Sequence, residues 1–239
     1  MLAAMLDDQA LGTRTPGEGG PAPLLPEARI LVRPARSADD WAAVRAICCR
    51  TGVAGEPVAP ERWPLFGELW IGPYQQLRPE WTYVAEVGGQ VAGYLTGCPD
   101  TAAFEHARPW AVTLRLLLRL ARGRYAWNAD ARRFVRRALG LVPMPEARFP
   151  AALRRRLLRD YPAHLHMNVD APFRRAGVGS ALVARYGTDL EARRVPGVHL
   201  FCGPDPRPFY TRLGFRELAV IELPSGARVH ALARALATP

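Results

Sequence analysis

The strongest chemical signal in this chain is a pair of glycines, Gly177 and Gly179, placed directly before a run of helical periodicity. Glycine has no Cβ, so a backbone that carries it can approach a ligand closely. At the first turn of a helix the backbone N–H groups lack helical acceptors, and the helix dipole is positive there. This arrangement predicts a site for a diphosphate group, formed by residues 174–180.

The flanking segments predict the strand and the helix that would position this loop. Residues 164–170 alternate apolar and polar side chains with a period of two, which is typical of a half-buried strand. After the glycines, apolar residues recur every three or four positions from Leu182 to Leu190, which indicates one apolar helical face. The helix is expected to end near Pro196 and Gly197, a pair that breaks helices.

Two other classes of glycine-rich loop do not fit this chain. The dinucleotide-binding fingerprint needs three glycines, G-x-G-x-x-G, and an acidic residue about 20 positions later. Here only two glycines occur, and Glu191 comes too early, inside the predicted helix. The phosphate loop of nucleotide hydrolases needs a lysine, and the chain contains none.

The loop resembles motif A of the GNAT superfamily of N-acetyltransferases, R/Q-x-x-G-x-G/A, which follows the fourth strand of that fold. A second signature comes in the expected order, because residues 209–215 are similar to the F-Y-x-x-L-G-F that ends the GNAT core. The resemblance covers residues 29–98 and 161–236. It implies an α/β (α+β) fold whose mixed, mostly antiparallel sheet of six to seven strands is splayed and flanked by helices.

The resemblance also implies that acetyl-CoA is the co-substrate and that no metal is needed. Main-chain groups of the fourth strand would hold the pantetheine arm where the fourth and fifth strands part, and the glycine loop would hold the phosphates. An ordinary strand-to-helix turn is the alternative for this loop. The predicted cofactor-binding residues are Met167, Asn168, Val169, Arg174, Arg175, Ala176, Gly177, Val178, Gly179, Ser180 and Asp205, the last in place of an asparagine that the family pattern usually has.

Tyr210, within the second signature, is the predicted general acid. In the family pattern this tyrosine protonates the departing thiolate of coenzyme A. A phenol with a pKa of about 10 suits that task because a free thiol has a pKa of about 8.5. The alternative is a packing role, which we expect for the neighbouring Phe209 and Phe215.

The general base has several candidates. An attacking amine must lose a proton, and imidazole titrates near neutral pH. His164 and His166 point to the same face of their strand because side-chain direction alternates. Each could equally be a hydrogen-bonded histidine without a catalytic role. Asp100 and Glu86, near the ends of the two preceding strands, are the rival carboxylates.

A finer resemblance rests on other segments. Residues 70–74, 84–86, 91–104 and 161–166 look like the bacterial relatives of the acetyltransferase-like domain at the C-terminal end of protein O-GlcNAc hydrolases. In that group motif A is intact in some members and degraded in others. Here it is intact, which favours cofactor binding.

The chain is expected to form one domain with additions. At 239 residues it exceeds the roughly 150 residues of a GNAT core. A Gly- and Pro-rich stretch suggests a flexible or loosely docked tail over residues 1–27, followed by a single domain over 28–236. We expect strands near 29–34, 81–87, 90–97, 164–170 and 198–202 with two closing strands up to about 234, helices near 38–50 and 206–213 besides the cofactor helix, and an irregular, proline-broken segment at 57–79.

Residues 101–160 are predicted to form a helical, arginine-rich insert. Leu114, Leu117, Leu118 and Ala121 share one helical face, and the run from Phe134 to Leu139 supplies another. The insert holds 14 arginines against four acidic residues, a formal charge of +10 that equals the net charge of the whole chain. It could steer an acidic acceptor or coenzyme A, contact nucleic acid, or be a solvated helix face.

The remaining composition bears on compartment and partners. Four cysteines without a paired spacing favour a reducing, cytoplasmic compartment, and no spacing suggests a metal. No run of 18 apolar residues occurs, so no membrane contact is expected. Nucleic acid is not expected as a partner, and the protein is expected to be a monomer or homodimer.

The sequence therefore predicts an acetyl-CoA-dependent N-acetyltransferase in which a primary amine, on a small molecule or a peptide, attacks the thioester directly. A non-catalytic acyl-CoA-binding or protein-interaction module is the main alternative. A regulator that contacts nucleic acid through the insert is the second.

Overall fold

The computed structural model describes residues 29–237 of the chain. The predicted N-terminal tail, residues 1–27, lies outside this part.

A seven-stranded sheet forms the centre of the described domain, in the order β1-β2-β3-β4-β5-β7-β6. Only β4 and β5 are parallel, whereas the other neighbours are antiparallel. The strands are β1 (Leu31–Pro34), β2 (Thr82–Val87), β3 (Gln90–Cys98), β4 (Ala163–Val169), β5 (Gly197–Cys202), β6 (Arg216–Glu222) and β7 (Arg228–Ala235). The predicted mixed, mostly antiparallel sheet is confirmed.

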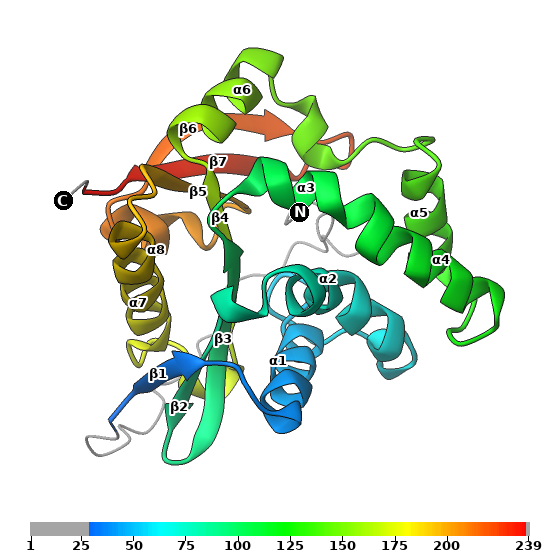
Figure 1. Cartoon of the computed structure of the whole chain (residues 1–239), viewed down its shortest axis with the longest axis horizontal. Helices are drawn as coiled ribbons and strands as arrows, with labels where there is room; N and C mark the ends of the chain where they lie inside the picture. Colours follow the sequence, from blue (N-terminus) through cyan, green and yellow to red (C-terminus); the bar gives the residue numbers. More distant parts are fainter. Residues whose placement is uncertain (1–28, 238–239) are drawn as a thin grey trace.

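Helices cover both faces of the sheet (Figure 1). On one face α7 packs on the sheet, and on the other face α1 and α2 pack on β3. The helices are α1 (Ala38–Arg50), α2 (Trp63–Leu77), α3 (Thr101–Arg108), α4 (Leu114–Ala121), α5 (Ala129–Ala138), α6 (Ala151–Asp160), α7 (Val178–Ala192) and α8 (Arg207–Arg212). Short 3₁₀ turns occupy Pro60–Arg62, Pro79–Trp81, Pro145–Arg148 and Ala171–Phe173, and a π-helical turn, Pro109–Thr113, joins α3 to α4.

The start of α1 is fixed by a capping box. Ser37 accepts a hydrogen bond from the backbone of Asp40 at 3.0 Å, and the Asp40 carboxylate accepts from the backbone of Ser37 at 3.0 Å. Arg33 of β1 also binds this carboxylate, and its guanidinium holds the pKa of Asp40 well below the usual range. Ser37 is therefore the N-cap of α1.

The segment predicted as irregular is largely the helix α2, and this prediction was wrong. The prolines of residues 57–79 suggested a broken segment, and two of them, Pro64 and Pro73, lie within α2. Pro64 lies in the first turn, where its missing N–H costs nothing. Pro73 lies inside the helix, which is held by the burial of Trp70, Ile71 and Tyr74. Tertiary packing therefore outweighs the local penalty.

Strands β4 and β5 part soon after they begin. They pair only at Ala163 with Val198 and at His164 with His199, while β4 stays paired with β3 up to Val169. The predicted splay in the middle of the sheet is therefore present. The edge of β4 that faces β5 has no strand partner beyond His164 in the described chain.

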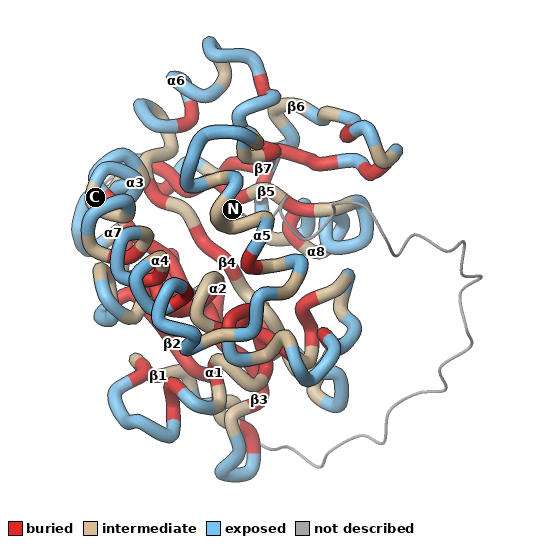
Figure 2. Tube along the Cα trace, turned by 90° about the vertical axis from the view of Figure 1, so that its right-hand side faces the viewer, coloured by how far each residue is buried: buried red, intermediate tan, exposed pale blue. Residues whose placement is uncertain are grey.

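The insert between β3 and β4 consists of α3 to α6, as its helical pattern predicted (Figure 1). Its inner side chains Leu116, Leu120 and Ala131 pack against Leu65 of α2. The helical face chosen from the sequence lies outward instead, since Leu114 and Leu118 are 48% and 44% exposed, and Figure 2 shows the insert helices largely in the exposed colour. Nearly every position of α4 is apolar or arginine, so periodicity alone could not select the buried face.

Candidate active site

The start of α7 presents backbone N–H groups that no side chain caps. Gly177 is the N-cap residue, with φ of +84°, a left-handed conformation that favours glycine. It makes no side-chain capping hydrogen bond. The first N–H groups of the helix, from Val178 to Ser180, lack helical acceptors. This is the arrangement that an anion-binding helix terminus requires.

The two arginines before the glycines do different things. Arg174 donates from Nε to the carbonyl of Val169 at 3.2 Å and from Nη2 to the carbonyl of Gly55 at 2.7 Å. It therefore ties the loop to the end of β4 and to the segment after α1. Arg175 is exposed and has φ of +65°. Its positive φ and that of Gly177 bend the loop sharply in front of α7.

Gly179 has a packing reason to be glycine besides the chemical one. A Cβ at this position would lie 3.0 Å from Cζ of Phe209 and 3.1 Å from Cε of Met167. The helix start therefore sits directly against β4 and α8. Asp205 is exposed in the turn before α8, and Ala176 is exposed within the loop.

Side chains of β4 alternate between the two faces of the sheet. Met167 and Val169 pack in the core that contains α7. His164, His166 and Asn168 point to the face of α1 and α2, as the alternation predicted. The backbone of the last three β4 residues is paired with β3 on one side, and its other edge borders the splay.

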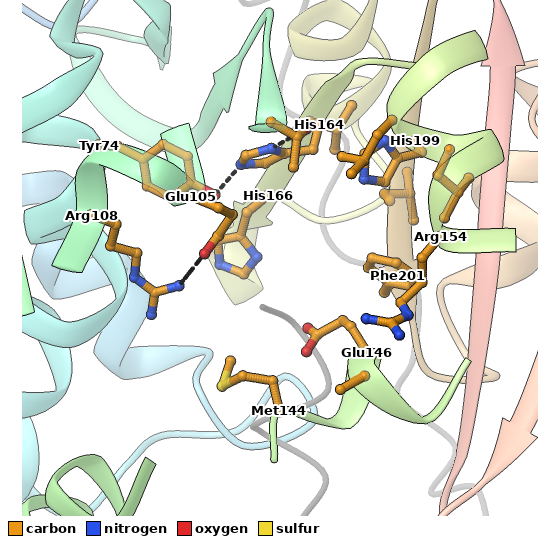
Figure 3. A pocket seen from close by; sticks show the side chains of 16 residues that line it. Tyr74, Glu105, Arg108, Met144, Glu146, Arg154, His164, His166, His199 and Phe201 are labelled. Atoms are coloured by element: carbon orange, nitrogen blue, oxygen red, sulfur yellow. Dashed lines mark hydrogen bonds and ion pairs between the residues drawn. The ribbon is translucent and has the colours of Figure 1, made fainter. Parts of the chain in front are cut away.

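A cavity of about 320 Å³ lies on the α1 and α2 side of the sheet, next to the splay (Figure 3). Its floor includes β4 around His166 and β5 around Leu200, so it meets the sheet where these strands separate. Its lining residues are Tyr74, Thr101, Glu105, Arg108, Met144, Glu146, Ala147, Arg154, Leu157, Leu158, His164, Leu165, His166, His199, Leu200 and Phe201.

His164 is held by hydrogen bonds at both ring nitrogens. The Thr101 hydroxyl donates its only proton to the carbonyl of Pro162 at 2.6 Å, so it accepts from Nδ1 of His164 at 2.8 Å. Nε2 then carries the lone pair and accepts from the hydroxyl of Tyr74 at 2.9 Å. Burial, with the nearby His199, holds the pKa of His164 well below its usual value. Its imidazole is therefore neutral and fully partnered.

His166 has one nitrogen to spare. Its ring is buried, stacks on Trp70 with centroids 5.8 Å apart, and places Nε2 at 3.3 Å from the Tyr94 hydroxyl and 3.4 Å from Nδ2 of Asn168. Nδ1 is buried without a hydrogen-bond partner. Burial lowers the pKa of His166 to about 4, so the ring is neutral at pH 7. A buried, unpartnered polar atom beside a cavity indicates a place for a ligand.

The Asn168 amide decides which tautomer His166 adopts. Nδ2 of Asn168 donates to the Tyr94 hydroxyl at 2.9 Å and faces Nε2 of His166, so Nε2 accepts and Nδ1 carries the proton. A flipped amide would accept from Nε2–H and leave the lone pair on Nδ1. The atom that borders the cavity can thus serve as a donor or as an acceptor, under the control of Asn168.

Tyr210 lies on α8 in the core below the splay. It is 6% exposed and packs edge-on against Phe209 and Phe215, with ring centroids 5.0 and 5.6 Å away. Burial and nearby Cys202 raise the pKa of its phenol above the usual value. The phenol is therefore protonated at neutral pH, and it does not line the cavity.

The two rival carboxylates have structural partners. Asp100 caps α3 by accepting from the backbone of Ala103 at 3.0 Å. Glu86 pairs with Arg33 of β1. Neither lines the cavity, so the structure brings only His164 and His166 of the predicted acid–base residues to it.

The sequence did not single out several cavity residues. Tyr74 belongs to the segment that was expected to be irregular, although its place on α2 is what sets it against His164. Glu105, Arg108, Glu146 and Arg154 belong to the insert, which was weighed for charge and not as a wall of a site. The i, i+3 spacing of Glu105 and Arg108 offers no signal for a cavity, because such pairs are common on exposed helices.

The described residues contain no cluster of three or more side chains suited to hold a metal ion. Over the same residues, none of the helices combines the length and the apolar character needed to span a membrane.

Comparisons with known proteins identify the fold and the family. No family model matches the chain. The solved structure of SsHAT is 31% identical, with a TM-score of 0.65, and the match covers 87% of this chain and 98% of that one. Two further solved structures share the fold, and each match covers 87% of this chain and 100% of the other. One is an acetyltransferase that is 19% identical, with a TM-score of 0.54. The other is a putative acetyltransferase of the GNAT family from Desulfovibrio desulfuricans that is 16% identical, with a TM-score of 0.51. The chain belongs to the GNAT family of N-acetyltransferases.

Proposed function

We propose that this enzyme transfers an acetyl group from acetyl-CoA to a primary amine that binds in the cavity beside His166. GNAT acetyltransferases use acetyl-CoA, whose thioester supplies the activated acetyl group. The observation that carries the proposal is the position of the cavity. It lies on the face of the sheet that α1 and α2 cover, and its lining residues on β4 and β5 lie next to the point where these strands separate.

The donor side fits the splay and the start of α7. The uncapped N–H groups from Val178 to Ser180 would hold the diphosphate, and Gly177 at the N-cap puts no side chain in front of them. The free edge of β4, from Met167 to Val169, would hold the amide-bearing arm by main-chain hydrogen bonds. These groups lie on the opposite side of β4 from the cavity, so the donor and the amine would meet through the gap between the strands.

The proton-handling groups would act from the two sides of the sheet. On the cavity side, Nδ1 of His166 would orient the amine and, with the Asn168 amide flipped, accept its proton. On the α7 side, the protonated phenol of Tyr210 would donate to the departing thiolate. A cationic amine would first release one proton to solvent and then attack as the neutral amine. The new N–C bond replaces the C–S bond, the second nitrogen proton goes to Nδ1 of His166, and the thiolate takes the proton of Tyr210.

The cavity favours a small acceptor. Its volume is about 320 Å³ and nine of its sixteen lining residues come from the insert, so it suits a small molecule better than the surface of a folded protein. Its apolar side chains, including Met144, Leu157 and Phe201, suit a hydrocarbon or aromatic body, while Glu105 and Glu146 suit the cationic amine. A peptide with a free amino end is the larger acceptor that such a cavity could admit. The finer likeness to the acetyltransferase-like domain of O-GlcNAc hydrolases stays a prediction, and it does not choose the acceptor.

A panel of amines, assayed for thiol release from acetyl-CoA, tests this proposal. Ala147 lines the cavity and Ala138 does not, although both are exposed alanines of the insert. Ala147→Trp should fill the cavity and raise the KM for the amine about tenfold or more without changing the Kd for acetyl-CoA, because the two sites lie on different sides of β4. Ala138→Trp should change neither. Acetyl-CoA binding without turnover on any amine would contradict the proposal, as would equal effects of the two tryptophans.

A further inference from the structure

The insert exposes most of the large apolar side chains that the described part of this protein shows to solvent. Nine large hydrophobic residues are exposed in the part of the chain that the structure describes, and seven belong to residues 101–160. Trp110 and Trp127 are 75% and 60% exposed. The seven are Trp110, Leu114, Leu118, Trp127, Leu139, Leu141 and Leu158. Soluble proteins rarely concentrate apolar side chains in this way unless the surface meets a partner.

Three of these side chains form a stripe along one helical stretch. Trp110, Leu114 and Leu118 are spaced four residues apart along the continuous stretch made by the π-helical turn and α4, and we call them the outer stripe. The opposite side of the same stretch is already buried, through Leu116 and Leu120. The helix therefore needs no further burial to hold its place, and its second apolar face is left outward.

Unpaired arginines flank the outer stripe. Arg115 follows Leu114, Arg122 lies one turn beyond Leu118, and Arg124 follows in the next loop, all exposed. Within residues 29–237 none of these three makes an ion pair, whereas Arg119 between them pairs with Glu68 at 3.1 Å. Apolar side chains and unneutralised positive charge therefore share one surface.

We propose that the outer stripe and its flanking arginines bind the surface of an anionic phospholipid bilayer. Trp and Leu side chains would enter the boundary between headgroups and acyl chains, and the guanidinium groups would contact lipid phosphates. A tryptophan beside arginines is the pattern that membrane–water interfaces favour. The helix would then lie along the membrane surface, with the outer stripe toward the acyl chains.

Charge selects this partner over the others. A second copy of the chain would bring the same +10 insert against itself, and like charges repel. Nucleic acid would meet the arginines but gain nothing from exposed leucines, which neither stack on bases nor bind phosphates. An anionic bilayer satisfies both the apolar and the positive side chains. The prediction that the chain makes no membrane contact considered only a spanning segment, which is a different pattern from a surface helix.

The docked helix is continuous with a wall of the cavity. α3, which supplies Glu105 and Arg108 to the cavity, runs through the π-helical turn into α4 (Figure 1). A bilayer bound at the outer stripe would therefore lie about two to three helical turns along the same helix from the acceptor site. An acceptor that partitions into the membrane interface would be presented close to its binding cavity.

Sedimentation of the full chain with vesicles tests this inference. Wild type should pellet with phosphatidylcholine vesicles that contain phosphatidylglycerol, far less with pure phosphatidylcholine, and less as salt is raised. Trp110→Ser, Leu114→Ser and Leu118→Ser combined should lower the partition coefficient about tenfold or more. The control combines Leu31→Ser and Val220→Ser, the two large exposed hydrophobic residues that lie outside the insert within residues 29–237, and should keep wild-type binding.

A second set of variants isolates charge. Arg115→Gln, Arg122→Gln and Arg124→Gln should abolish the preference for phosphatidylglycerol. The control replaces three exposed arginines outside the insert by glutamine: Arg29, Arg216 and Arg228. It lowers the net charge by the same amount and should leave the preference for phosphatidylglycerol intact. Equal effects of the two sets would show a net-charge effect and overturn the proposal.

Quenching of tryptophan fluorescence by brominated lipids provides an independent measurement, because it reports where Trp110 lies even when the variant still binds vesicles. Lipids brominated near the headgroup should quench wild-type tryptophan fluorescence, and Trp110→Phe should remove most of that quenching. Failure of wild type to bind phosphatidylglycerol vesicles overturns the proposal. So does a result in which the outer-stripe variants change the oligomeric state or retention on DNA while vesicle binding persists.

Discussion

Two neighbouring histidines of one strand face the same way and have different environments. Both nitrogens of His164 are engaged, by Tyr74 and Thr101, whereas Nδ1 of His166 has no partner at the edge of the cavity. The alternation of β4 predicted their common direction, but it could not separate them. The difference arises from Tyr74 and Thr101, which lie far away in sequence.

Replacing each histidine by leucine should therefore have opposite effects. His164→Leu leaves the buried Tyr74 hydroxyl without its acceptor and should lower the free energy of unfolding by about 1–3 kcal/mol, while most of kcat/KM is retained. His166→Leu removes the atom at the cavity and should lower kcat/KM about 100-fold or more with little loss of stability. Urea unfolding and steady-state kinetics measure the two quantities. The reverse pattern would assign the site to His164.

At the scale of elements, the strand, loop and helix around the glycines were predictable and the acceptor side was not. The β4 alternation, the glycine pair and the α7 periodicity are local signals, and all three elements appear where they were expected. α2 was missed because its prolines outweighed its apolar run in the sequence. In α4 the buried face was misassigned because leucines lie on both sides. In both helices the outcome depends on tertiary packing, which a single sequence does not display.

Tyr186 of α7 packs closely against Gly97 of β3, next to the point where β4 and β5 separate. The Tyr186 hydroxyl of α7 donates to the carbonyl of His164 at 2.7 Å and to that of Cys98 at 3.1 Å. A Cβ on Gly97 of β3 would lie 2.5 Å from this hydroxyl and 2.8 Å from the carbonyl oxygen of His164. The backbone itself would have to move to make room.

Gly97→Ala should lower the free energy of unfolding by about 1–3 kcal/mol or more, because it overpacks this contact. Gly67→Ala, in α2, is the matched control, since its Cβ would make only ordinary contacts at 3.5 Å with Arg45. That change should raise stability by about 0.5–1 kcal/mol through helix propensity. Urea unfolding compares the pair. Equal tolerance of both alanines would contradict the close approach of α7 to β3.

At the scale of the whole molecule, burial of three histidines makes stability depend on pH. His166 and His199 are buried and His164 is half-buried, and desolvation lowers the pKa of all three, to about 4 for His166 and for His199. An unfolded imidazole has a pKa of about 6.5. Between pH 6.5 and about 4 the unfolded chain therefore binds protons that the folded chain does not. Stability falls as pH falls through this window, by about 1.4 kcal/mol per pH unit for each imidazole.

Urea unfolding at pH 7 and pH 5 measures this slope. His199→Leu should reduce the slope of the free energy of unfolding against pH by the contribution of one imidazole. The control is His106→Leu, which removes an exposed histidine of α3. Asp40 adds nothing in this window, because a carboxyl whose pKa is lowered by folding affects stability only near and below its unfolded value of about 3.9. A slope that is unchanged in His199→Leu would contradict the burial of neutral imidazoles.

The molecule as a whole combines a donor side that its sequence makes recognisable with an acceptor side that this chain builds from its own insert.

The central claim is that the start of α7 holds the phosphates of acetyl-CoA. Titration calorimetry with acetyl-CoA tests it most directly, in wild type, Gly177→Trp and Gly226→Trp. Gly226 matches Gly177 in positive φ, +80° against +84°, and lies in open space in the turn between β6 and β7. We expect wild type and Gly226→Trp to bind acetyl-CoA with the same Kd and Gly177→Trp to lose binding, because an indole at the start of α7 would block the phosphates. Absence of binding in wild type, or undiminished binding in Gly177→Trp, would contradict the account.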